Sequence, residues 1–378
     1  MPLTFSKSKE LTLGVEVEVQ LVDRDTLALA PASTKIIDGL GGYNGAVKHE
    51  LMMSNLEIIT KVCGSVQEVA DDLYGTFNAA IAEAARHDIL ICGAGTHPFS
   101  TWKEQKLTPD ARYKRLLFSL GGVARRFNIF GLHVHVGIGD GEKCIYVMNR
   151  MLYYLPHLLA LSSNSPFWEG EDTALKSFRT VVFGTLPTAG LPFYFNDWDD
   201  YARLIDCFIS TRTIETIREI WWDARPHPDL GTIEIRICDT PATVADALAI
   251  TALIQALVAR FCREYERGMP YARLPSHVIR QNKWRASRYG LDGEFITEAG
   301  DRTVKAREAI GELIKSLYKE AGELGSTEYL ALAEQLVTRG DGASRQLDVW
   351  RLEGDLQRVV LYLAHELEND VKAGSSMR

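Results

Sequence analysis

Side chains of the types that bind metals recur at alternate positions of short apolar segments. Residues i and i+2 of a β-strand point to the same side of a sheet, about 6.5–7 Å apart along the strand. Carboxylates suit Mg²⁺ or Mn²⁺, and imidazoles enter more readily for Mn²⁺ or Zn²⁺. If these segments pair in one sheet, a single surface therefore collects several metal ligands and an arginine. The set consists of Glu16 and Glu18, Glu57, His133 and His135, and Glu234 with Arg236.

The polar face of each strand could also simply face water. Solvated sheet faces favour Thr, Lys, Gln and Ser, whereas Glu16 and Glu18 on one strand repel each other unless a positive charge lies between them. A divalent cation would supply that charge. His133 and His135, taken alone, are compatible with one zinc site or with hydrogen-bonded structural residues. The surrounding Glu residues favour a hard cation over a His-rich zinc site.

Period-two alternation identifies the strands that must position these residues. Strands that are apolar on one side only are typical of an antiparallel sheet with one face on a helical core. The sequence therefore predicts an α+β fold and favours it over a doubly wound parallel sheet. The expected strands cover residues 13–21, 56–61, 89–92, 131–137 and 231–239.

Helix signals flank these strands. Ser65 and Glu68 form a capping box, which predicts that a helix over residues 66–84 begins there. Thr240 followed by Pro241 predicts the start of a long helix that continues through Phe261. No Pro/Gly/Ser linker divides the chain. We expect one catalytic domain, residues 1–378, with a mostly helical C-terminal portion from about residue 303.

Composition excludes several classes of protein. The 378 residues include 42 Lys and Arg against 50 Asp and Glu, a net charge of −8, and 46% are hydrophobic. That apolar content excludes a disordered chain, and the acidic balance argues against nucleic acid as a partner. None of the six cysteines forms a C-x-x-C pair, which fits reduced cytosolic thiols. The N-terminus lacks an apolar signal region and the longest apolar stretch, residues 247–259, is short for a membrane span. We therefore expect a cytoplasmic protein without membrane contact.

Phosphate-binding loops are missing from the sequence. Residues 137–142 read G-I-G-D-G-E, which lacks the sixth-position glycine of a dinucleotide fingerprint, and there is no P-loop motif. A bound nucleotide would have to be held by metals and by scattered Arg and Lys. One basic-aromatic cluster, containing Lys283, Arg285 and Arg288 beside Trp284 and Tyr289, could hold phosphate or adenine, or could cap a helix at the surface.

Taken together, these segments resemble the carboxylate–amine ligase family, of the glutamate–cysteine ligase 2 type, which is related to the wider glutamate–cysteine ligases. The resemblance runs in order over most of the chain. Each block alone is weak, but the set is specific. The matching blocks are residues 13–18, 50–60 with Glu57, 93–99, Arg112-Tyr113, 131–137, Ser165-Pro166, Arg179, 231–241 and 288–291.

The resemblance implies a glutamine-synthetase-like catalytic fold, in which the concave face of a curved antiparallel sheet, flanked by helices, binds the metals. By this similarity, Arg236 and Arg179 contact phosphates or the transferring group and are the catalytic pair. Many members have a third Glu where this chain has Val17, which we expect to be a buried packing change. The implied Mg²⁺ or Mn²⁺ ligands are Glu16, Glu18, Glu57, His133 and Glu234, and the expected ATP-binding residues are Arg179, Arg236, Lys283, Arg285 and Arg288.

The implied reaction is the ATP-dependent joining of a carboxylate and an amine through an acyl phosphate. Glutamate and cysteine are the substrates that the family implies, although another small-molecule acid and amine would leave the same pattern. Two alternatives stay open at this point: a zinc hydrolase built on His133 and His135, and a non-catalytic ATP- and metal-binding protein on a ligase fold. The oligomeric state is also open, with a homodimer as one option.

Overall fold

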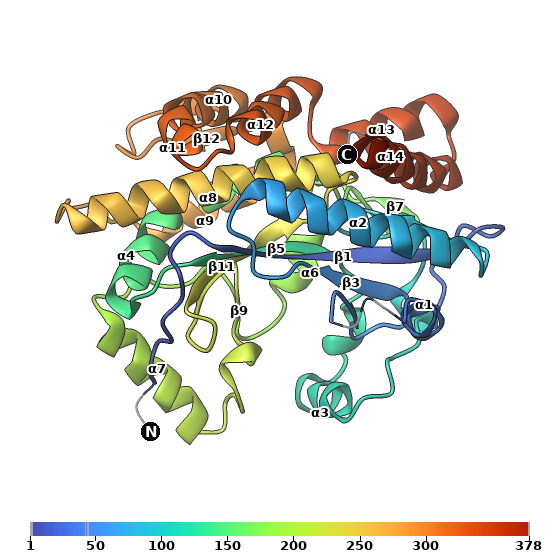
Figure 1. Cartoon of the computed structure of the whole chain (residues 1–378), viewed down its shortest axis with the longest axis horizontal. Helices are drawn as coiled ribbons and strands as arrows, with labels where there is room; N and C mark the ends of the chain where they lie inside the picture. The colour runs from blue at the N-terminus through green and yellow to red at the C-terminus, as the bar shows by residue number, and fades with distance from the viewer. Residues whose placement is uncertain (1–2, 42, 44, 377–378) are drawn as a thin grey trace.

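An antiparallel sheet of seven strands forms the centre of the computed structural model, which describes residues 3–41, 43 and 45–376 (Figure 1). The N-terminal strand β1 lies in the middle and pairs with β3, β4 and β5. The fold is α+β, as predicted. Across the sheet the order is β10 (Ala224–His227), β11 (Thr232–Asp239), β5 (Gly131–Gly137), β1 (Leu13–Asp23), β3 (Asn55–Ile59) and β2 (Val47–His49), and β4 (Ile89–Cys92) pairs with the end of β1.

The predicted strands agree with these bounds to within two residues at each end. Their alternation has the expected cause, because the side chains between the charged positions are buried. Val15, Val17 and Val19 belong to the hydrophobic core, and they point away from Glu16 and Glu18. Val17 is therefore a packing residue, as predicted.

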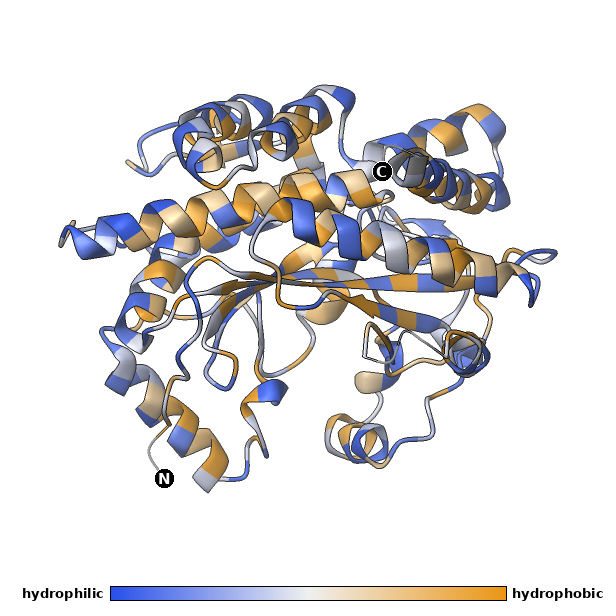
Figure 2. Ribbon diagram, in the orientation of Figure 1, coloured by the Kyte–Doolittle hydropathy of each residue, from blue (hydrophilic) through white to orange (hydrophobic). Residues whose placement is uncertain are grey.

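Two long helices cover the apolar side of the sheet: α2 (Val66–Ala85) and α8 (Val244–Glu266) (Figure 1). The side chain of Ser65 accepts a hydrogen bond from the Glu68 backbone N–H, which confirms the predicted start of α2. Helix α8 is long and apolar enough to cross a membrane by length and composition alone, but 89% of its apolar stretch is buried in the protein. It packs against the sheet on one side and α12 on the other, and it is apolar along most of its length (Figure 2).

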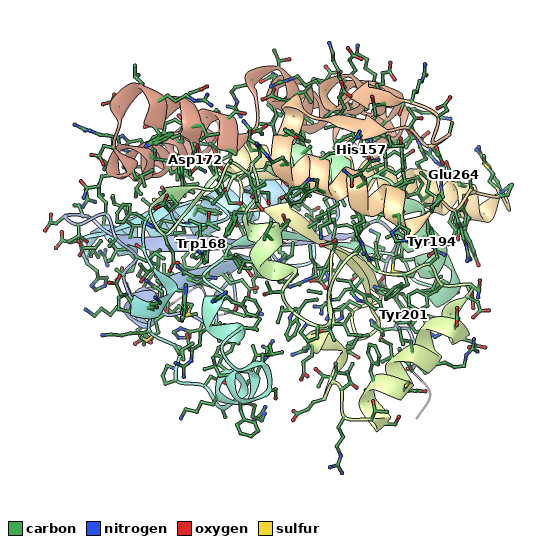
Figure 3. All side chains as sticks on the ribbon, turned by 180° about the vertical axis from the view of Figure 1, so that it is seen from behind. His157, Trp168, Asp172, Tyr194, Tyr201 and Glu264 are labelled. Carbon is green, nitrogen blue, oxygen red and sulfur yellow. The ribbon has the colours of Figure 1, made fainter. Side chains whose placement is uncertain are left out.

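The remaining helices form an outer layer above α8 and two lobes on the opposite side of the sheet (Figure 1). Tyr201, from one of those lobes, is fully buried and packs edge-on against Phe195 (Figure 3). The outer layer contains α10 (Ala306–Ser316), α11 (Tyr318–Glu323), α12 (Thr327–Arg339), α13 (Gly342–Glu353) and α14 (Leu356–Ser376), whereas α9 (Ser276–Tyr289) packs against α5. The other helices are α1 (Ser33–Gly39), α3 (Ala111–Leu120), α4 (Gly141–Met151), α5 (Leu155–Ser162), α6 (Arg179–Phe183) and α7 (Trp198–Ser210).

Short elements complete the fold. Three two-stranded sheets pair β6 (Phe167–Trp168) with β7 (Glu171–Asp172), β8 (Ala189–Gly190) with β9 (Trp221–Trp222), and β12 (Glu294–Ile296) with β13 (Thr303–Lys305). Four single-turn 3₁₀ helices are η1 (Trp102–Glu104), η2 (Ala124–Arg126), η3 (Ile217–Glu219) and η4 (Gly290–Asp292). The predicted helical C-terminal portion thus begins at Ala306, directly after β13.

The predicted start of α8 was wrong. The helix is capped by Thr243, whose side chain accepts from the Asp246 N–H, and not by Thr240. The Thr240 hydroxyl instead donates to the Glu18 backbone carbonyl at 2.7 Å, and the Thr240 carbonyl accepts from Asn164 Nδ2 at 2.8 Å. Contacts with distant parts of the chain therefore hold Thr240 outside the helix.

The N-terminus of α8 is also capped by a residue from the other end of the protein. Asp370 in α14 accepts the backbone N–H groups of Val244 at 2.9 Å and Ala245 at 3.2 Å. These N–H groups have no acceptor within their own helix. A carboxylate at this end also interacts favourably with the helix dipole.

We predict that Asp370→Ala lowers the free energy of unfolding by about 1–2 kcal/mol, the usual cost of losing a helix cap. The melting temperature and the urea midpoint would both fall. Glu368→Ala, which removes a charge of the same sign from α14 and a surface ion pair with Lys372, is the matched control. Equal stability losses in the two variants would contradict a capping role for Asp370.

Candidate functional site

A cavity of about 510 Å³ opens on the polar side of the sheet, between the two lobes. Strands β1, β2, β3, β5, β10 and β11 contribute its floor, and α3, α6 and the region around η3 contribute its walls. The charged residues that line it are Glu16, Glu18, Lys48, Glu50, Glu57, Arg112, Arg179, Arg218, Arg225, Glu234 and Arg236, joined by His49, His133, His135 and His227.

Strand register brings the predicted ligands together. Glu16 lies directly across from His133 on β5, and Glu18 lies across from Glu57 on β3. On the other side of β5, His135 lies across from Glu234. These residues come from four strands that are far apart in the sequence, so the cluster exists only when the sheet is formed.

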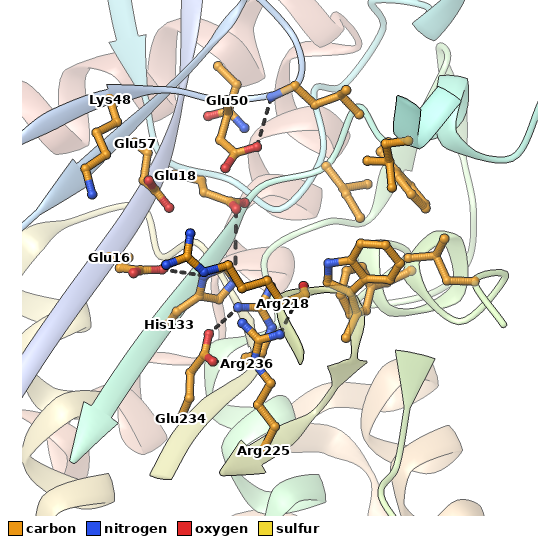
Figure 4. A pocket seen from close by; sticks show the side chains of 18 of the residues that line it. Glu16, Glu18, Lys48, Glu50, Glu57, His133, Arg218, Arg225, Glu234 and Arg236 are labelled. Carbon is orange, nitrogen blue, oxygen red and sulfur yellow. Dashed lines mark hydrogen bonds and ion pairs between the residues drawn. The ribbon is translucent and has the colours of Figure 1, made fainter. Parts of the chain in front are cut away.

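Two groups of these side chains have the geometry of metal sites. Glu16, His133 and Glu234 form one group, and Glu18, Glu57 and His133 form the other. Within each group the candidate ligand atoms all lie within 4.8 Å of one another. His133 lies between the two groups, with Nδ1 at 3.2 Å from Glu16 Oε2 and Nε2 at 4.0 Å from Glu18 Oε1 (Figure 4).

The sequence left open which of the two histidines faces a metal. His133 belongs to both groups. His135 lies beside them: its Nδ1 bonds Thr232 Oγ1 at 3.0 Å, and its Nε2 lies 3.6 Å from Glu16 and 3.7 Å from Glu234. The geometry thus favours His133 as a ligand and places His135 next to the same carboxylates.

The pKa values of the carboxyl groups at the two ends of the site are shifted in opposite directions. Burial and the neighbouring charge of Glu50 raise the pKa of Glu18 to about 8. Burial and the charges of Glu50 and Glu16 hold the pKa of Glu57 well above its ordinary value. Among the described residues, no Arg or Lys lies within ion-pair distance of Glu18, Glu50 or Glu57. The described part of the protein thus supplies no Arg or Lys in direct contact with the carboxyl groups at this end of the cluster, and their raised pKa values favour the protonated form.

At the other end, protein groups supply the counter-charges. Burial alone would raise the pKa of Glu234, but the guanidinium groups of Arg225 and Arg236 lower it well below its ordinary value. Arg225 Nε lies 2.5 Å from Glu234 Oε2, and Arg236 Nη1 bonds the other oxygen. Hydrogen bonds to His133 and His135 likewise outweigh burial and lower the pKa of Glu16.

Arg236 and Arg179, the predicted catalytic pair, both line the cavity. Arg236 lies on the same face of β11 as Glu234, as the alternation predicted. The Arg179 side chain comes from the start of α6 and is buried, with Nη2 donating to the Arg236 carbonyl at 3.3 Å. Both guanidinium groups therefore reach the cavity, and that of Arg179 lies against the backbone of β11.

The predicted basic-aromatic cluster on α9 is not at this cavity. Lys283, Arg285 and Arg288 are absent from its lining. Lys283 Nζ pairs with the buried Asp223 at 2.6 Å, Arg285 bonds the Glu294 carbonyl, and Arg288 stacks on Tyr289. Helix α9 packs against α5 and β12, and its basic residues interact with protein groups outside the cavity.

Several lining residues were missed as site residues in the sequence. Arg225 lies opposite Glu234 on the edge strand β10, a segment whose Pro226 and short length gave no strand signal. Glu50 follows β2 and belongs to a block of the family resemblance, but it has no partner at i+2 to mark it. Arg218 and Lys48 stand alone in the sequence, and only the fold brings them to the cavity.

The sequence of the chain is similar to those of known proteins over almost its whole length. Residues 12–361 match the family described as Glutamate-cysteine ligase family 2 (GCS2). A Gloeobacter violaceus protein named provisionally as glutamate–cysteine ligase 2 is 42% identical over 363 residues, which is 95% of this chain and 98% of that protein. A Thermobifida fusca protein with the same name is 41% identical over 382 residues, which is 100% of this chain and 96% of that protein.

Solved structures agree at the level of the fold. The glutamate–cysteine ligase of Francisella tularensis, solved in complex with AMP, superposes with a TM-score of 0.69 at 13% identity and covers 98% of this chain and 95% of its own. A bifunctional glutathione synthetase from Pasteurella multocida gives a TM-score of 0.66 at 13% identity, over 97% of this chain and 53% of that one. The fold is glutamine-synthetase-like, as predicted. The chain therefore belongs to glutamate–cysteine ligase family 2, and it is an enzyme of the carbon–nitrogen ligase class.

Proposed function

We propose that this protein is an ATP-dependent carboxylate–amine ligase that joins glutamate to cysteine, or a closely related acid to an amine, through an acyl phosphate. The observation that carries the proposal is the cavity floor, where five carboxylates and His133 lie beside Arg179 and Arg236. Family membership supports the ligase chemistry, and the AMP bound to the Francisella tularensis relative supports a nucleotide as co-substrate.

The cavity floor fits Mg²⁺ or Mn²⁺. The proposed ligands are Glu16, His133 and Glu234 in one group, and Glu18, Glu57 and His133 in the other. Carboxylate oxygens with one imidazole are a donor set that Mn²⁺ and Mg²⁺ accept. The raised pKa values of Glu18, Glu50 and Glu57 support the same conclusion, because such close carboxylates ionise together only when a cation lies between them.

A bound divalent cation would neutralise the phosphate oxygens of ATP and favour transfer of the terminal phosphoryl group to a carboxylate oxygen. The carboxylate oxygen takes the γ-phosphoryl group and ADP leaves, which gives an acyl phosphate. The amine nitrogen then attacks the acyl carbon, phosphate leaves, and the nitrogen loses a proton to give the amide. The guanidinium groups of Arg179 and Arg236 are placed to donate to the transferring phosphoryl oxygens. Phe183, Trp221 and Leu116 contribute apolar walls that limit water near the reactive acyl phosphate.

Substrate carboxylates have their own candidate partners. Among the described side chains, the guanidinium groups of Arg112 and Arg218 line opposite walls and have no carboxylate within ion-pair distance. Such groups suit small anionic substrates, in keeping with an amino acid as acid, amine or both. Which acid and amine are joined is decided by these walls.

Two alternatives are less well supported. A zinc hydrolase would use His133 and His135 as paired ligands, but His135 bonds Thr232 and the surrounding donors are carboxylates. A non-catalytic binding protein is at odds with a complete set of ligands and arginines. The membership in a ligase family also favours the ligase.

We further propose that the whole chain acts as one catalytic unit in the cytoplasm. Helix α8 packs on the sheet and also on α12 and α14, so the C-terminal helices share the central core. Five of the six cysteines are buried free thiols, in keeping with a reducing compartment.

We predict that Glu16→Gln lowers kcat by at least about 10²–10³-fold, because one charged group that holds the metal and phosphates is lost. The assay is ADP release with glutamate, cysteine, ATP and Mg²⁺ or Mn²⁺. Glu353→Gln, an exposed change of the same kind at the end of α13, is the control. Near-normal turnover in Glu16→Gln, with its fold intact, would overturn the metal assignment, and a wild type without ADP release for any acid and amine would overturn the ligase.

We also predict that metal binding releases protons. A carboxyl group with a raised pKa still holds its proton near pH 7, and a cation must displace that proton. The affinity for Mn²⁺ should therefore rise between pH 7 and 8, in a range where Glu16 and Glu234 are already ionised. Titration calorimetry in two buffers of different ionisation enthalpy measures the protons released.

The variant Glu57→Gln provides the control for that measurement. It removes one carboxyl group with a raised pKa, so fewer protons should be released and the pH dependence should weaken. Proton release that is zero in the wild type, or unchanged in Glu57→Gln, would contradict this account of the site.

A further inference from the structure

The loop between α5 and α6, residues 163–178, delivers Arg179 to the cavity. The loop is folded back on itself: Ser165 N donates to the Lys176 carbonyl at 3.1 Å, and Phe178 N donates to the Ser165 carbonyl at 2.9 Å. Trp168 and Asp172 mark it in Figure 3. Any group that fixes Ser165 and Ser177 therefore fixes the point from which the Arg179 side chain extends.

The Arg179 guanidinium lies very close to the backbone of β5. A Cβ atom added at Gly131 would lie 2.2 Å from Arg179 Nη2, so only glycine leaves room for it. The Gly131 N–H donates to Glu18 Oε2 at 2.6 Å, which places Arg179 next to the carboxylate cluster. The side chain's own hydrogen bonds to the Ile237 and Arg236 carbonyls are long, at 3.4 and 3.3 Å, and its buried Nε has no partner among the described residues.

Asp239, at the end of β11, is a fully buried carboxylate that does not contact the cavity. It accepts three hydrogen bonds from neutral donors: Asn164 N at 2.9 Å, Ser165 Oγ at 2.6 Å and Ser177 Oγ at 2.9 Å. Among the described residues, no cationic side chain lies within ion-pair distance of it. Burial raises its pKa, and the charge of Arg179 is the largest influence that lowers it.

A direct chain of hydrogen bonds connects the two residues. The Arg179 backbone N–H donates to Ser165 Oγ at 3.1 Å, and that hydroxyl donates to Asp239. Ser177, two residues before Arg179, is held by the other oxygen of Asp239. Gly95 belongs to the same arrangement, because a Cβ there would lie 2.7 Å from Asp239 Cγ.

We propose that Asp239 is a positioning residue, which sets the Arg179 guanidinium against Gly131 and beside Glu18 through Ser165, Ser177 and the attraction between the two opposite charges. Burying a carboxylate that receives hydrogen bonds only from neutral donors costs free energy. A neutral side chain could anchor the loop by similar hydrogen bonds, so anchoring alone does not explain a charged residue at this position. On this proposal, the role of the Asp239 charge is to attract the Arg179 guanidinium group.

The variant Asp239→Asn separates charge from hydrogen bonding. Its amide oxygen can accept from Asn164 N and Ser165 Oγ, and its amide nitrogen can donate to Ser177 Oγ, which already has Thr180 Oγ1 as a second partner. The fold is therefore expected to survive while the charge is lost. Glu320→Gln is the matched control: this carboxylate of α11 is also buried and pairs with Arg260 and Arg263 of α8, and none of the three residues lines the cavity or belongs to the loop.

The test is a double-mutant cycle on kcat, measured by ADP release at saturating substrates and metal, and it rests on the proposed ligase function. Asp239→Asn should lower kcat about 10- to 100-fold, the cost of a misplaced catalytic group. Arg179→Gln should lower it about 10²–10³-fold. On the Arg179→Gln background, Asp239→Asn should have almost no further effect, whereas Glu320→Gln should leave kcat unchanged on either background.

Multiplicative losses in the double variant would overturn the proposal, because they would mean that Asp239 acts independently of Arg179. If Asp239→Asn does not fold, Ser165→Ala cuts the same connection and should show the same non-additivity with Arg179→Gln. If the wild type shows no turnover, the proposed function fails on its own. Crystal structures of the wild type and Asp239→Asn then decide the positioning role: an Arg179 guanidinium that stays against Gly131 without the Asp239 charge would refute it.

Discussion

The structure depends on one electrostatic constraint: five carboxylates must share one buried face of a sheet. The protein solves half of this problem itself, since Arg225 and Arg236 pair with Glu234 and two imidazoles bond Glu16. It leaves Glu18, Glu50 and Glu57 without a cationic partner among the described residues. Burying carboxyl groups without a cationic partner is expensive, so the apolar core on the other face must supply the stability that permits it. The site thus runs from carboxylates that the protein pairs with cationic groups to carboxyl groups whose raised pKa values favour the protonated form.

Gly131 and backbone hydrogen bonds help to fix the positions of the arginine side chains as well as those of the carboxylates. Gly131 allows Arg179 to reach the sheet and at the same time donates to Glu18. The register between β11 and β5 shifts between Ile235 and Cys238, beside Arg236. Bulges of this kind re-aim side chains next to functional sites. The local backbone of β5 and β11 thus decides where the guanidinium groups meet the carboxylates.

Much of this arrangement could be predicted from the sequence because it follows from periodicity. Alternation fixed which residues share a face, so Glu16 and Glu18, and Glu234 and Arg236, were identified correctly as neighbours. Features that depend on distant contacts could not be predicted. Thr240 has the local signature of a helix cap, but its hydroxyl bonds Glu18. Lys283 looks like a phosphate ligand, but it pairs with Asp223, and Arg225 is visible only once β10 is paired.

The central place of β1 in the sheet has a consequence for how the chain folds. This strand is among the first to be synthesised, but its partner β5 begins more than a hundred residues later, and β11 can join only after β5. Such non-local pairing raises the contact order and slows folding, since long loops must close before the contacts form. During that time β3 can already cover one edge of β1, but the edge that pairs with β5 stays open and apolar side chains are exposed, a state prone to aggregation. The yield of folded protein is therefore expected to depend on how quickly β5 is synthesised and pairs with β1. Chaperones that shield β1 are expected to raise that yield.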